Sequence, residues 1–371
     1  MEHALNEMLA QHLNSKNPSR PRRFRFLRFA PSLGLALLAA SLRAQVPAPS
    51  TGALASPERA RVVRVTDPRA INGFEAQSDA VRGMVDRGML AFSGKIDIRS
   101  AWHEYLGPED RIGIKVVSGP GKTSGTRVAV VDAVVTGLLA AGFSAKQIIV
   151  WDRHIADLRQ AGYFGLAERY GVRVAGASEE GYDNETAYES NMIGKLIWND
   201  HEFGKTGENI GKKSFVSKLV TREMTKIILV SPLLNHNEIG VSGQFASLTL
   251  GSLDNTLRFE SDPSRLAVVV PEMYAMPALG DKVALCLVDA LICQYQGEQT
   301  SLLHYSARLN QIWVSKDPVA LDVLSIREIE RQRQAAKIPS PRLNWDLYQN
   351  AFLLQLGINE PRQIHVIDAA P

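Results

Sequence analysis

The sequence predicts an α/β domain of three layers, in which helices cover both faces of a mostly parallel central sheet. Short apolar runs alternate along the chain with longer segments whose apolar residues recur every three or four positions, so we expect strands to alternate with helices. Several of the short runs, such as Ile148–Trp151, are apolar at every position. This pattern is typical of strands that are buried on both faces of a parallel sheet.

The elements follow in order along residues 61–371, which we interpret as a single domain. The expected strands are Val62–Thr66, Ile112–Val117, Ile148–Trp151, Val172–Ala175, Lys226–Ser231, Ala267–Val270, Val283–Val288, Ile312–Ser315 and Gln363–Ile367. The expected helices are Ser78–Ala91, Thr126–Ala141, Ile155–Tyr170, Val319–Arg333 and Leu343–Leu356. Asp317 is the expected N-cap of the fourth helix, and Pro318 is the expected first-turn residue. One turn further on, we expect Asp322 to contact water or Lys316.

Residues 176–218 interrupt this alternation. The segment is polar and rich in glycine, so we expect a long excursion from the sheet that forms either a lid or a small subdomain. Within it, Asp200, His201 and Glu202 are expected on a solvated polar face.

The first 44 residues resemble an export signal. They carry seven Lys and Arg against two acids, a net charge of +5, so the rest of a chain with net charge +3 carries −2. Arg22 and Arg23 precede the apolar run Pro31–Leu42, which is too short to span a membrane. The pattern favours a twin-arginine signal with one inserted residue; an ordinary secretory signal and a short amphipathic anchor are the alternatives.

This interpretation places the protein in the periplasm, with the export machinery as a partner of the leader and a Pro/Ser/Ala-rich linker at residues 45–60. We expect no stable membrane span in the mature chain. Without a basic excess after the leader, we also expect no nucleic-acid binding. The two cysteines, Cys286 and Cys293, are too few to hold an iron–sulfur cluster, and we expect Cys286 to be a buried free thiol.

The stretch VVSGPGKTSG, residues 116–125, is a near match to two nucleotide-binding motifs. A phosphate-binding loop of the Walker type needs glycine where this chain has Val116, and the dinucleotide fingerprint is altered at its last small residue. The glycine-rich sequence does predict a turn. In it, the backbone amides of Thr123, Ser124 and Gly125 would face an anion beside Lys122. A simple turn with a solvated lysine is the alternative.

Five segments together resemble an uncharacterised prokaryotic family, domain of unknown function 362. They are residues 113–153, which include GIKVVSGPGKTSG, and residues 228–252, 285–298, 312–330 and 347–358. The resemblance implies the fold but no reaction. Some relatives carry ferredoxin-type cysteine clusters, which this chain lacks. The chain also departs from the family pattern at Val117, where relatives often have Asn, at Leu234, where they often have Lys, and at Leu250 and Glu260, where one subgroup has histidine.

Polar residues follow five of the expected strands, at the sheet edge where ligands bind in open parallel sheets. The candidates there are Ser118, Gly119, Lys122, Asp152, Arg153, His154, Asn235, His236, Asp289, Lys316 and Asp317. Lys115 lies inside an apolar strand, so it must be paired with an acid such as Asp152 or Asp289, contact an anionic ligand, or reach water from an edge strand. His236 is interpreted as a proton-transfer group, a metal ligand, or a loop histidine bonded to a carbonyl.

These observations favour an exported enzyme that acts on a small anionic substrate. We expect the catalytic residues to be Lys115, His236 and Asp289, and the ligand-binding residues to be Ser118, Gly119, Lys122, Thr123, Asp152 and Asn235. His236, Asp152 and Asp289 have the chemistry to hold a divalent metal. The alternatives are a non-catalytic exported binding or accessory protein and an oxidoreductase with a nucleotide cofactor.

Overall fold

The computed structural model describes residues 59–369. The predicted export signal and residues 45–58 of the linker lie outside this range. The strands are β1 (Ala60–Thr66), β2 (Ile71–Asn72), β3 (Glu75–Ala76), β4 (Ile112–Lys115), β5 (Ile148–Asp152), β6 (Arg173–Gly176), β7 (Tyr182–Glu189), β8 (Lys213–Ser217), β9 (Lys226–His236), β10 (Gly240–Val241), β11 (Val283–Gln294), β12 (Ser306–Ser315) and β13 (Ile364–Ala369).

Twelve α-helices and several short 3-10 or π turns connect these strands within the described range. The α-helices are α1 (Ser78–Ser93), α2 (Ile98–His103), α3 (Gly121–Ser124), α4 (Val128–Ala140), α5 (Ile155–Ala161), α6 (Phe164–Tyr170), α7 (Ala177–Glu180), α8 (Gln244–Ser252), α9 (Leu257–Glu260), α10 (Pro263–Tyr274), α11 (Pro318–Ala335) and α12 (Asp346–Leu353). No helix in residues 59–369 is both long enough and apolar enough to cross a lipid bilayer.

The central sheet is mostly parallel, as the sequence predicts. Its strands lie in the order β13-β1-β12-β11-β9-β4-β5-β6, and β10 pairs with β9. Strands β11, β9, β4, β5 and β6 are parallel to one another, whereas β12 is antiparallel to both of its neighbours. From β4 the chain first adds β5 and β6 on one side and then places β9 and β11 on the other side. The chain order therefore reverses between β4 and β9.

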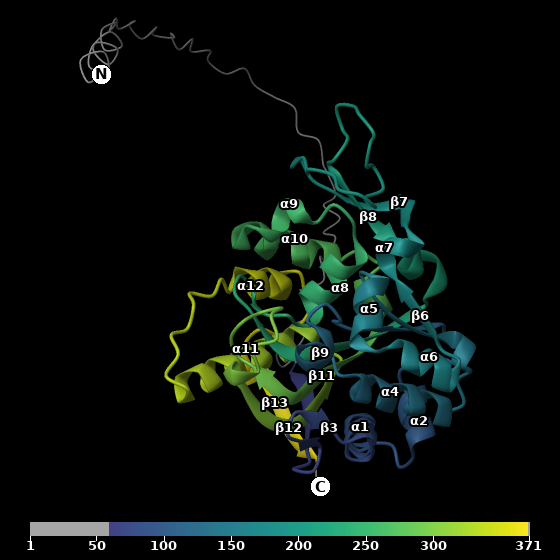
Figure 1. Ribbon diagram of the computed structural model, residues 1–371, viewed down its shortest axis with the longest axis vertical. Helices are drawn as coiled ribbons and strands as arrows, with labels where there is room; N and C mark the ends of the chain where they lie inside the picture. Colours follow the sequence, from purple (N-terminus) through teal and green to yellow (C-terminus); the bar gives the residue numbers. More distant parts are fainter. Residues whose placement is uncertain (1–58, 370–371) are drawn as a thin grey trace, which may run out of the picture. The chain divides into compact units, whose positions relative to one another are not determined.

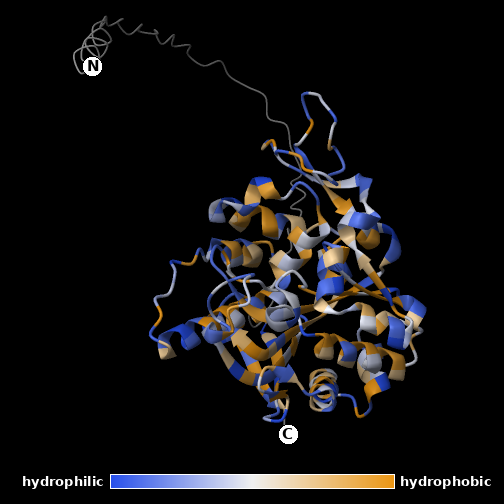
Figure 2. Ribbon diagram, viewed as in Figure 1, coloured by the Kyte–Doolittle hydropathy of each residue, from blue (hydrophilic) through white to orange (hydrophobic). Residues whose placement is uncertain are grey.

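Helices cover both faces of this sheet and give the domain its three layers (Figure 1). Helices α1, α2 and α4 pack on the face that buries Ile112, Ile114 and Ile228. Helices α8, α10, α11 and α12 cover the other face, where Trp151 and Leu229 are buried. The central strands are largely hydrophobic in Figure 2, which agrees with the apolar runs that predicted them.

Two predicted elements are wrong or incomplete. Residues 267–270, predicted as a strand, lie in helix α10 because the Asp262 side chain accepts the Ser264 amide as an N-cap and Pro263 follows it at the first helical position. The predicted helix Ile155–Tyr170 is broken into α5 and α6 at Gly162, whose φ of 93° is left-handed. The predicted free thiol at Cys286 is confirmed, since it is buried and unpaired on β11.

The excursion at residues 176–218 forms an antiparallel pair, β7 and β8, separate from the central sheet. Asp200 and Glu202 are buried there, so the prediction that they lie on a solvated face is wrong. Their carboxylates accept hydrogen bonds from backbone amides: Asp200 from Ile197 and Asn255, and Glu202 from Gly211. In a glycine-rich loop the side chains supply the acceptors that no sheet partner provides.

Candidate functional site

A buried ion pair joins the carboxyl ends of two neighbouring strands. Lys115 ends β4 and Asp152 ends β5, and the Lys115 Nζ donates to Asp152 Oδ1 over 2.7 Å. The Lys115 ammonium also donates to the Val116 carbonyl at 2.7 Å and lies 5.5 Å from the centre of the Trp151 ring. The expectation that Lys115 pairs with an acid is therefore met by Asp152, with the lysine only 1% exposed.

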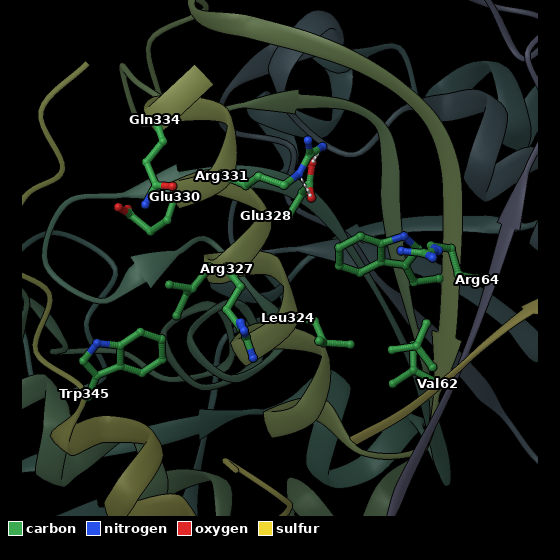
Figure 3. A pocket seen from close by; sticks show the side chains of 12 residues that line it. Val62, Arg64, Leu324, Arg327, Glu328, Glu330, Arg331, Gln334 and Trp345 are labelled. Carbon is green, nitrogen blue, oxygen red and sulfur yellow. Dashed lines mark hydrogen bonds and ion pairs between the residues drawn. The ribbon is translucent and has the colours of Figure 1, made fainter. Parts of the chain in front are cut away.

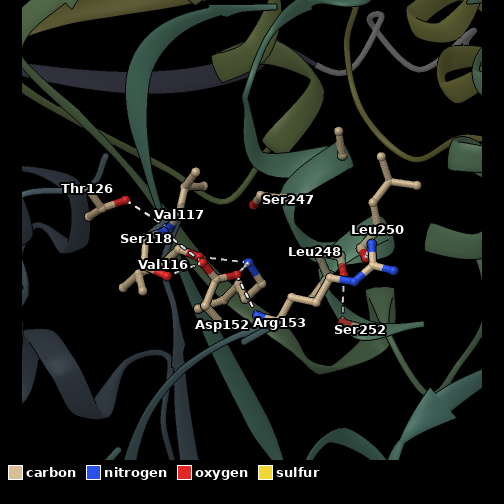
Figure 4. Close-up of polar contacts among 12 residues, drawn as sticks. Val116, Val117, Ser118, Thr126, Asp152, Arg153, Ser247, Leu248, Leu250 and Ser252 are labelled. Carbon is tan, nitrogen blue, oxygen red and sulfur yellow. Dashed lines mark hydrogen bonds and ion pairs between the residues drawn. The ribbon is translucent and has the colours of Figure 1, made fainter. Parts of the chain in front are cut away.

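Asp152 is an organising group for the surrounding loops. Its Oδ2 accepts both the amide and the hydroxyl of Ser118 at 2.7 Å, and its Oδ1 accepts the Arg153 amide at 2.8 Å. Burial alone raises the pKa of Asp152, but the Lys115 charge and these hydrogen bonds outweigh it and hold the pKa below its usual value. Figure 4 shows Asp152 between Ser118 and Arg153. The carboxylate therefore stays ionised and its oxygens are used by the protein.

Helix α8 closes one side of the site against this ion pair. A Cβ atom at Gly251 would lie 2.6 Å from the Lys115 Cε and 2.9 Å from its Nζ, so glycine is needed for the helix to approach. The Arg153 guanidinium donates to the Leu250 carbonyl at 3.3 Å, as Figure 4 shows, and to Thr256 Oγ1 at 3.1 Å. Two cations thus lie at the carboxyl end of α8, where the helix dipole favours positive charge.

The opposite end of α8 is held by an acid. The Asp322 carboxylate on α11 accepts the Gln244 amide at 2.7 Å and the Phe245 amide at 3.2 Å. Burial raises the pKa of Asp322 to about 7, against the lowering effect of these two amides. The prediction that Asp322 contacts water or Lys316 is wrong, whereas Asp317 caps α11 as predicted by accepting the Ala320 amide. The carboxyl end of α8 therefore meets cations, and its amino end meets a carboxyl group whose ionised form has the sign that the helix dipole favours.

His236 ends β9, the strand on the other side of β4. Its Nδ1 accepts the Glu238 amide at 3.2 Å and lies 4.0 Å from the Glu298 carboxylate. Burial lowers the pKa of His236, although Glu298 and Glu238 oppose this shift. Asn235, one residue earlier, accepts the Glu298 amide at 3.0 Å. Asn235 thus fixes the loop after β11 rather than lining the open space.

The glycine loop after β4 reaches the site with its first residues only. Ser118 binds Asp152, and Gly119 and Pro120 line the open space in front of it. Lys122 is exposed and does not line that space, and Thr123 donates to the Ser301 hydroxyl at 3.1 Å. The Gly125 amide donates to the Gly121 carbonyl inside the turn, so it is not free for an anion as predicted.

A cleft of about 380 Å³ lies between the ends of β4, β5 and β9, at the point where the chain order of the sheet reverses. Because α4 and α8 follow β4 and β9 onto opposite faces, the space between the two strand ends stays open. Of the predicted site residues, the cleft is lined by Lys115, Gly119, Asp152 and His236. Arg153 and His154, which the sequence places at the same edge of the sheet without a specific role, also line the cleft. Ser242, Ser247 and Glu260 line it too and were not predicted as site residues.

Asp289 does not belong to this cleft. It is fully buried on β11, where its carboxylate accepts the Arg127 amide at 2.8 Å and the Arg127 guanidinium at 3.1 Å. The predicted catalytic role for Asp289 is therefore not supported by its position. Nor do His236, Asp152 and Asp289 meet as metal ligands: in residues 59–369, no three His, Cys, Asp or Glu side chains are grouped as a metal site requires.

The oxidoreductase alternative is also weakened by the geometry. In the dinucleotide fold, an acid after the second strand binds the ribose hydroxyls. The corresponding candidate, Asp152, has its oxygens engaged by Lys115, Ser118 and Arg153. A four-residue turn, α3, rather than a long helix follows the glycine loop, so the loop does not present a helix amino terminus of the usual kind.

Two further hollows lie on the described surface. One, of about 450 Å³ between α11 and strands β1, β12 and β13, is shown in Figure 3. Its arginines are largely paired, Arg331 with Glu328 and Arg64 with Asp368. The other, of about 790 Å³, lies where β1 begins and β12 ends, beside α12. Neither is at the carboxyl ends of the parallel strands, so the cleft between β4 and β9 is the candidate site.

Comparisons with known proteins identify a family and name no activity. A family model described as a domain of unknown function, DUF362, matches residues 112–327. The crystal structure of a protein from Thermotoga maritima aligns with a TM-score of 0.38 and 9% identity, over 72% of this chain and 61% of that chain. That similarity is too low to support an inference. No curated protein matches the sequence.

Three of the four positions at which the chain departs from the resembled family pattern line the cleft. They are Val117, Leu250 and Glu260. Leu250 and Glu260 both contact Arg153, through a carbonyl and through a carboxylate oxygen 3.4 Å away. Two of the four departures thus contact the same guanidinium.

Proposed function

Because the chain belongs to the family of domain of unknown function 362, whose description assigns no reaction, we propose a function from the cleft itself. The protein is an enzyme that acts on a small anionic substrate bound between the ends of β4, β5 and β9. The observation that supports this proposal is the meeting of Lys115, Arg153 and His236 around one open space at the reversal point of the sheet. Cations beside a hydrogen-bonding imidazole are suited to bind an anion and to stabilise negative charge as it develops.

Lys115 and Arg153 each have an N–H donor without a hydrogen-bond acceptor in the described part of the chain. An ammonium has three N–H donors, and the Val116 carbonyl and Asp152 accept two of those on Lys115. In the described part of the chain, the Arg153 Nε is buried without a hydrogen-bond partner. Buried donors of this kind are normally satisfied by a ligand or by water. An anionic oxygen in the cleft fits this need.

His236 has a definite role in this proposal. Because its Nδ1 accepts the Glu238 amide, the neutral ring carries its proton on Nε2. Burial lowers the pKa of His236, which keeps the ring neutral near pH 7. His236 therefore offers an N–H donor to the substrate and stabilises an oxyanion, rather than removing a proton as a base would.

The test is a thermal-shift screen of small carboxylates and phosphates at fixed ionic strength, since a ligand that binds only the folded state raises the melting temperature. We expect at least one anion to stabilise the wild type and to stabilise His236→Gln less. The matched control is His365→Gln, at an exposed position on the edge strand β13, which should respond like the wild type. The absence of any shift across the panel would contradict the proposal.

The same anion then separates an enzyme from a binding protein. It is incubated with a small amount of protein and its proton NMR spectrum is followed over time. New resonances that do not appear with His236→Gln support catalysis. Binding with an unchanged spectrum supports the non-catalytic accessory protein instead.

We also propose that the protein is exported to the periplasm by the twin-arginine route, on the basis of Arg22, Arg23 and the apolar run that follows them. Cell fractionation of the wild type and of the Arg22→Lys/Arg23→Lys variant tests this. The wild type should be found shortened in the periplasm and the variant retained in the cytoplasm. Export of both proteins would indicate an ordinary secretory signal, and an uncleaved wild type in the cytoplasm would refute export.

A further inference from the structure

The loop that joins β7 to β8, residues 190–212, exposes a cluster of large apolar side chains. Trp198 is 76% exposed, Ile193 63%, Phe203 47% and Ile197 40%. The Trp198 and Phe203 rings meet edge to face with their centres 5.7 Å apart. Single exposed apolar residues are normal on protein surfaces, but four within residues 193–203 mark an interaction surface. Figure 1 shows this teal loop projecting away from the sheet layers.

The acids of this loop are turned inward. Asp200 accepts the Ile197 amide at 2.8 Å and the Asn255 amide at 3.0 Å, and Glu202 accepts the Gly211 amide at 2.9 Å. Both carboxylates are buried, although they lie in the chain between the exposed Trp198 and Phe203. These hydrogen bonds hold the loop in place and keep the two carboxylates away from its exposed surface.

The charge that stays at the surface is mainly positive. Lys195 and Lys205 are exposed within the loop, and Lys212 and Lys213 are partly exposed at its end. Glu208 is the exposed acid within the loop; on β7, Glu185 and Glu189 are also exposed, and Glu189 lies 3.8 Å from Lys213. Within residues 190–212, the charged side chains that are exposed or partly exposed are therefore Lys195, Lys205, Lys212 and Glu208, an excess of positive charge that favours contact with an anionic surface.

We propose that this loop binds the surface of an anionic lipid bilayer. Tryptophan and phenylalanine favour the region between lipid headgroups and acyl chains, and neighbouring lysines are attracted to anionic headgroups. The proposal is independent of the cleft, so its failure would leave the proposed enzyme untouched.

The experiment uses the fluorescence of Trp198 in the full chain. All five tryptophans lie at or beyond Trp102, so the first 58 residues add no signal even if they bind lipid themselves. Trp102, Trp151 and Trp313 are buried, and Trp345→Phe removes the other exposed one. In this background, vesicles of phosphatidylcholine and phosphatidylglycerol should shift the emission to shorter wavelength, and brominated acyl chains should quench it.

Matched variants identify the surface. The double change Ile193→Ser/Phe203→Ser should weaken the vesicle-dependent emission change about tenfold or more in lipid concentration. Ile96→Ser, at a 98% exposed position between α1 and α2, should have no effect. Loss of the response in vesicles of phosphatidylcholine alone, or in 0.5 M salt (screening length about 4 Å), supports the anionic requirement.

Three results would overturn the proposal. The first is an unchanged, unquenched Trp198 emission in the presence of the anionic vesicles. The second is an equal response from Ile193→Ser/Phe203→Ser. The third is an emission shift that depends on protein concentration without lipid, which would assign the loop to contact between copies of this chain.

Discussion

The Nζ of Lys115 lies 2.7 Å from Oδ1 of Asp152, and this buried ion pair is the point at which β4, β5 and α8 meet. It connects the fold to the candidate site because both residues line the cleft while each is almost fully buried. The pair holds Ser118 and Arg153 through the same carboxylate. Changes at this position should therefore affect stability and ligand binding together.

The first prediction concerns the removal of one partner of this pair. Asp152→Asn leaves the Lys115 charge buried without a counterion, and we expect it to lower the free energy of unfolding by about 3–5 kcal/mol. Lys115→Met/Asp152→Asn should recover part of that loss, because the unpaired charge is gone. Urea unfolding of both variants and of Lys115→Met gives the coupling energy. Additive effects would mean that the two side chains do not depend on each other.

Glycine 251 provides a second prediction about the same contact. Gly251→Ala would place a methyl group 2.6 Å from the Lys115 Cε, so we expect the variant to be less stable by about 1–3 kcal/mol. The matched control is Gly165→Ala in α6, where a Cβ meets no atom within 4 Å. That change should be neutral or stabilising by up to about 1 kcal/mol, since alanine favours helix. Equal stability of the two variants would show that α8 does not press on Lys115.

The third prediction is that Asp289 stabilises the fold and takes no part in ligand binding at the cleft. Asp289→Asn deprives the buried Arg127 of its counterion and should lower the free energy of unfolding by about 3–5 kcal/mol. Because Asp289 does not line the cleft, the variant, measured where it is still folded, should keep the wild-type affinity for any anion that binds there. Arg127→Met/Asp289→Asn, which removes both charges, serves as the control for stability. A selective loss of ligand affinity would return Asp289 to the site.

The comparison of sequence and structure shows which kind of inference succeeds. Apolar runs such as Ile148–Trp151 identify strands correctly because burial on both faces demands apolar residues at every position. Residues 267–270 satisfy the same rule and yet are helical, since a short apolar run does not distinguish a buried helix from a strand. For this segment, Asp262 as an N-cap and Pro263 at the first helical position indicate a helix.

The candidate site was predictable only in part. Lys115 attracts notice because a charge inside an apolar strand needs a partner, and Asp152 was one of two acids considered. Asp289 is excluded as the partner of Lys115 by the order of the strands, because β11 lies next to β9 and not next to β4. Arg153 was predicted at the sheet edge but received no role, because its partners, Leu250 and Glu260, are about a hundred residues away in the chain and meet it only through α8 and α9.

The last prediction is a pH dependence from Asp322. Its pKa is raised to about 7 by burial, whereas an aspartate in an unfolded chain titrates near ~3.9. Between these two values the folded state binds more protons than the unfolded state, so stability should be fullest below about pH 4 for this group and should decrease as pH rises toward 7. Above that range the contribution no longer changes.

Asp322→Asn removes this titration but keeps an oxygen that can accept an amide at the start of α8. The decrease in urea midpoint between pH 5 and pH 8, about three pH units, should therefore be smaller in the variant than in the wild type. Asp254→Asn is the appropriate comparison, because burial also raises the pKa of Asp254 to about 7, at a position that accepts the His201 and Phe215 amides. Each single variant should show a smaller decrease in urea midpoint between pH 5 and pH 8 than the wild type. The double variant should show the smallest decrease. An unchanged slope in Asp322→Asn would mean that Asp322 is ionised throughout, with the Gln244 and Phe245 amides strong enough to offset its burial.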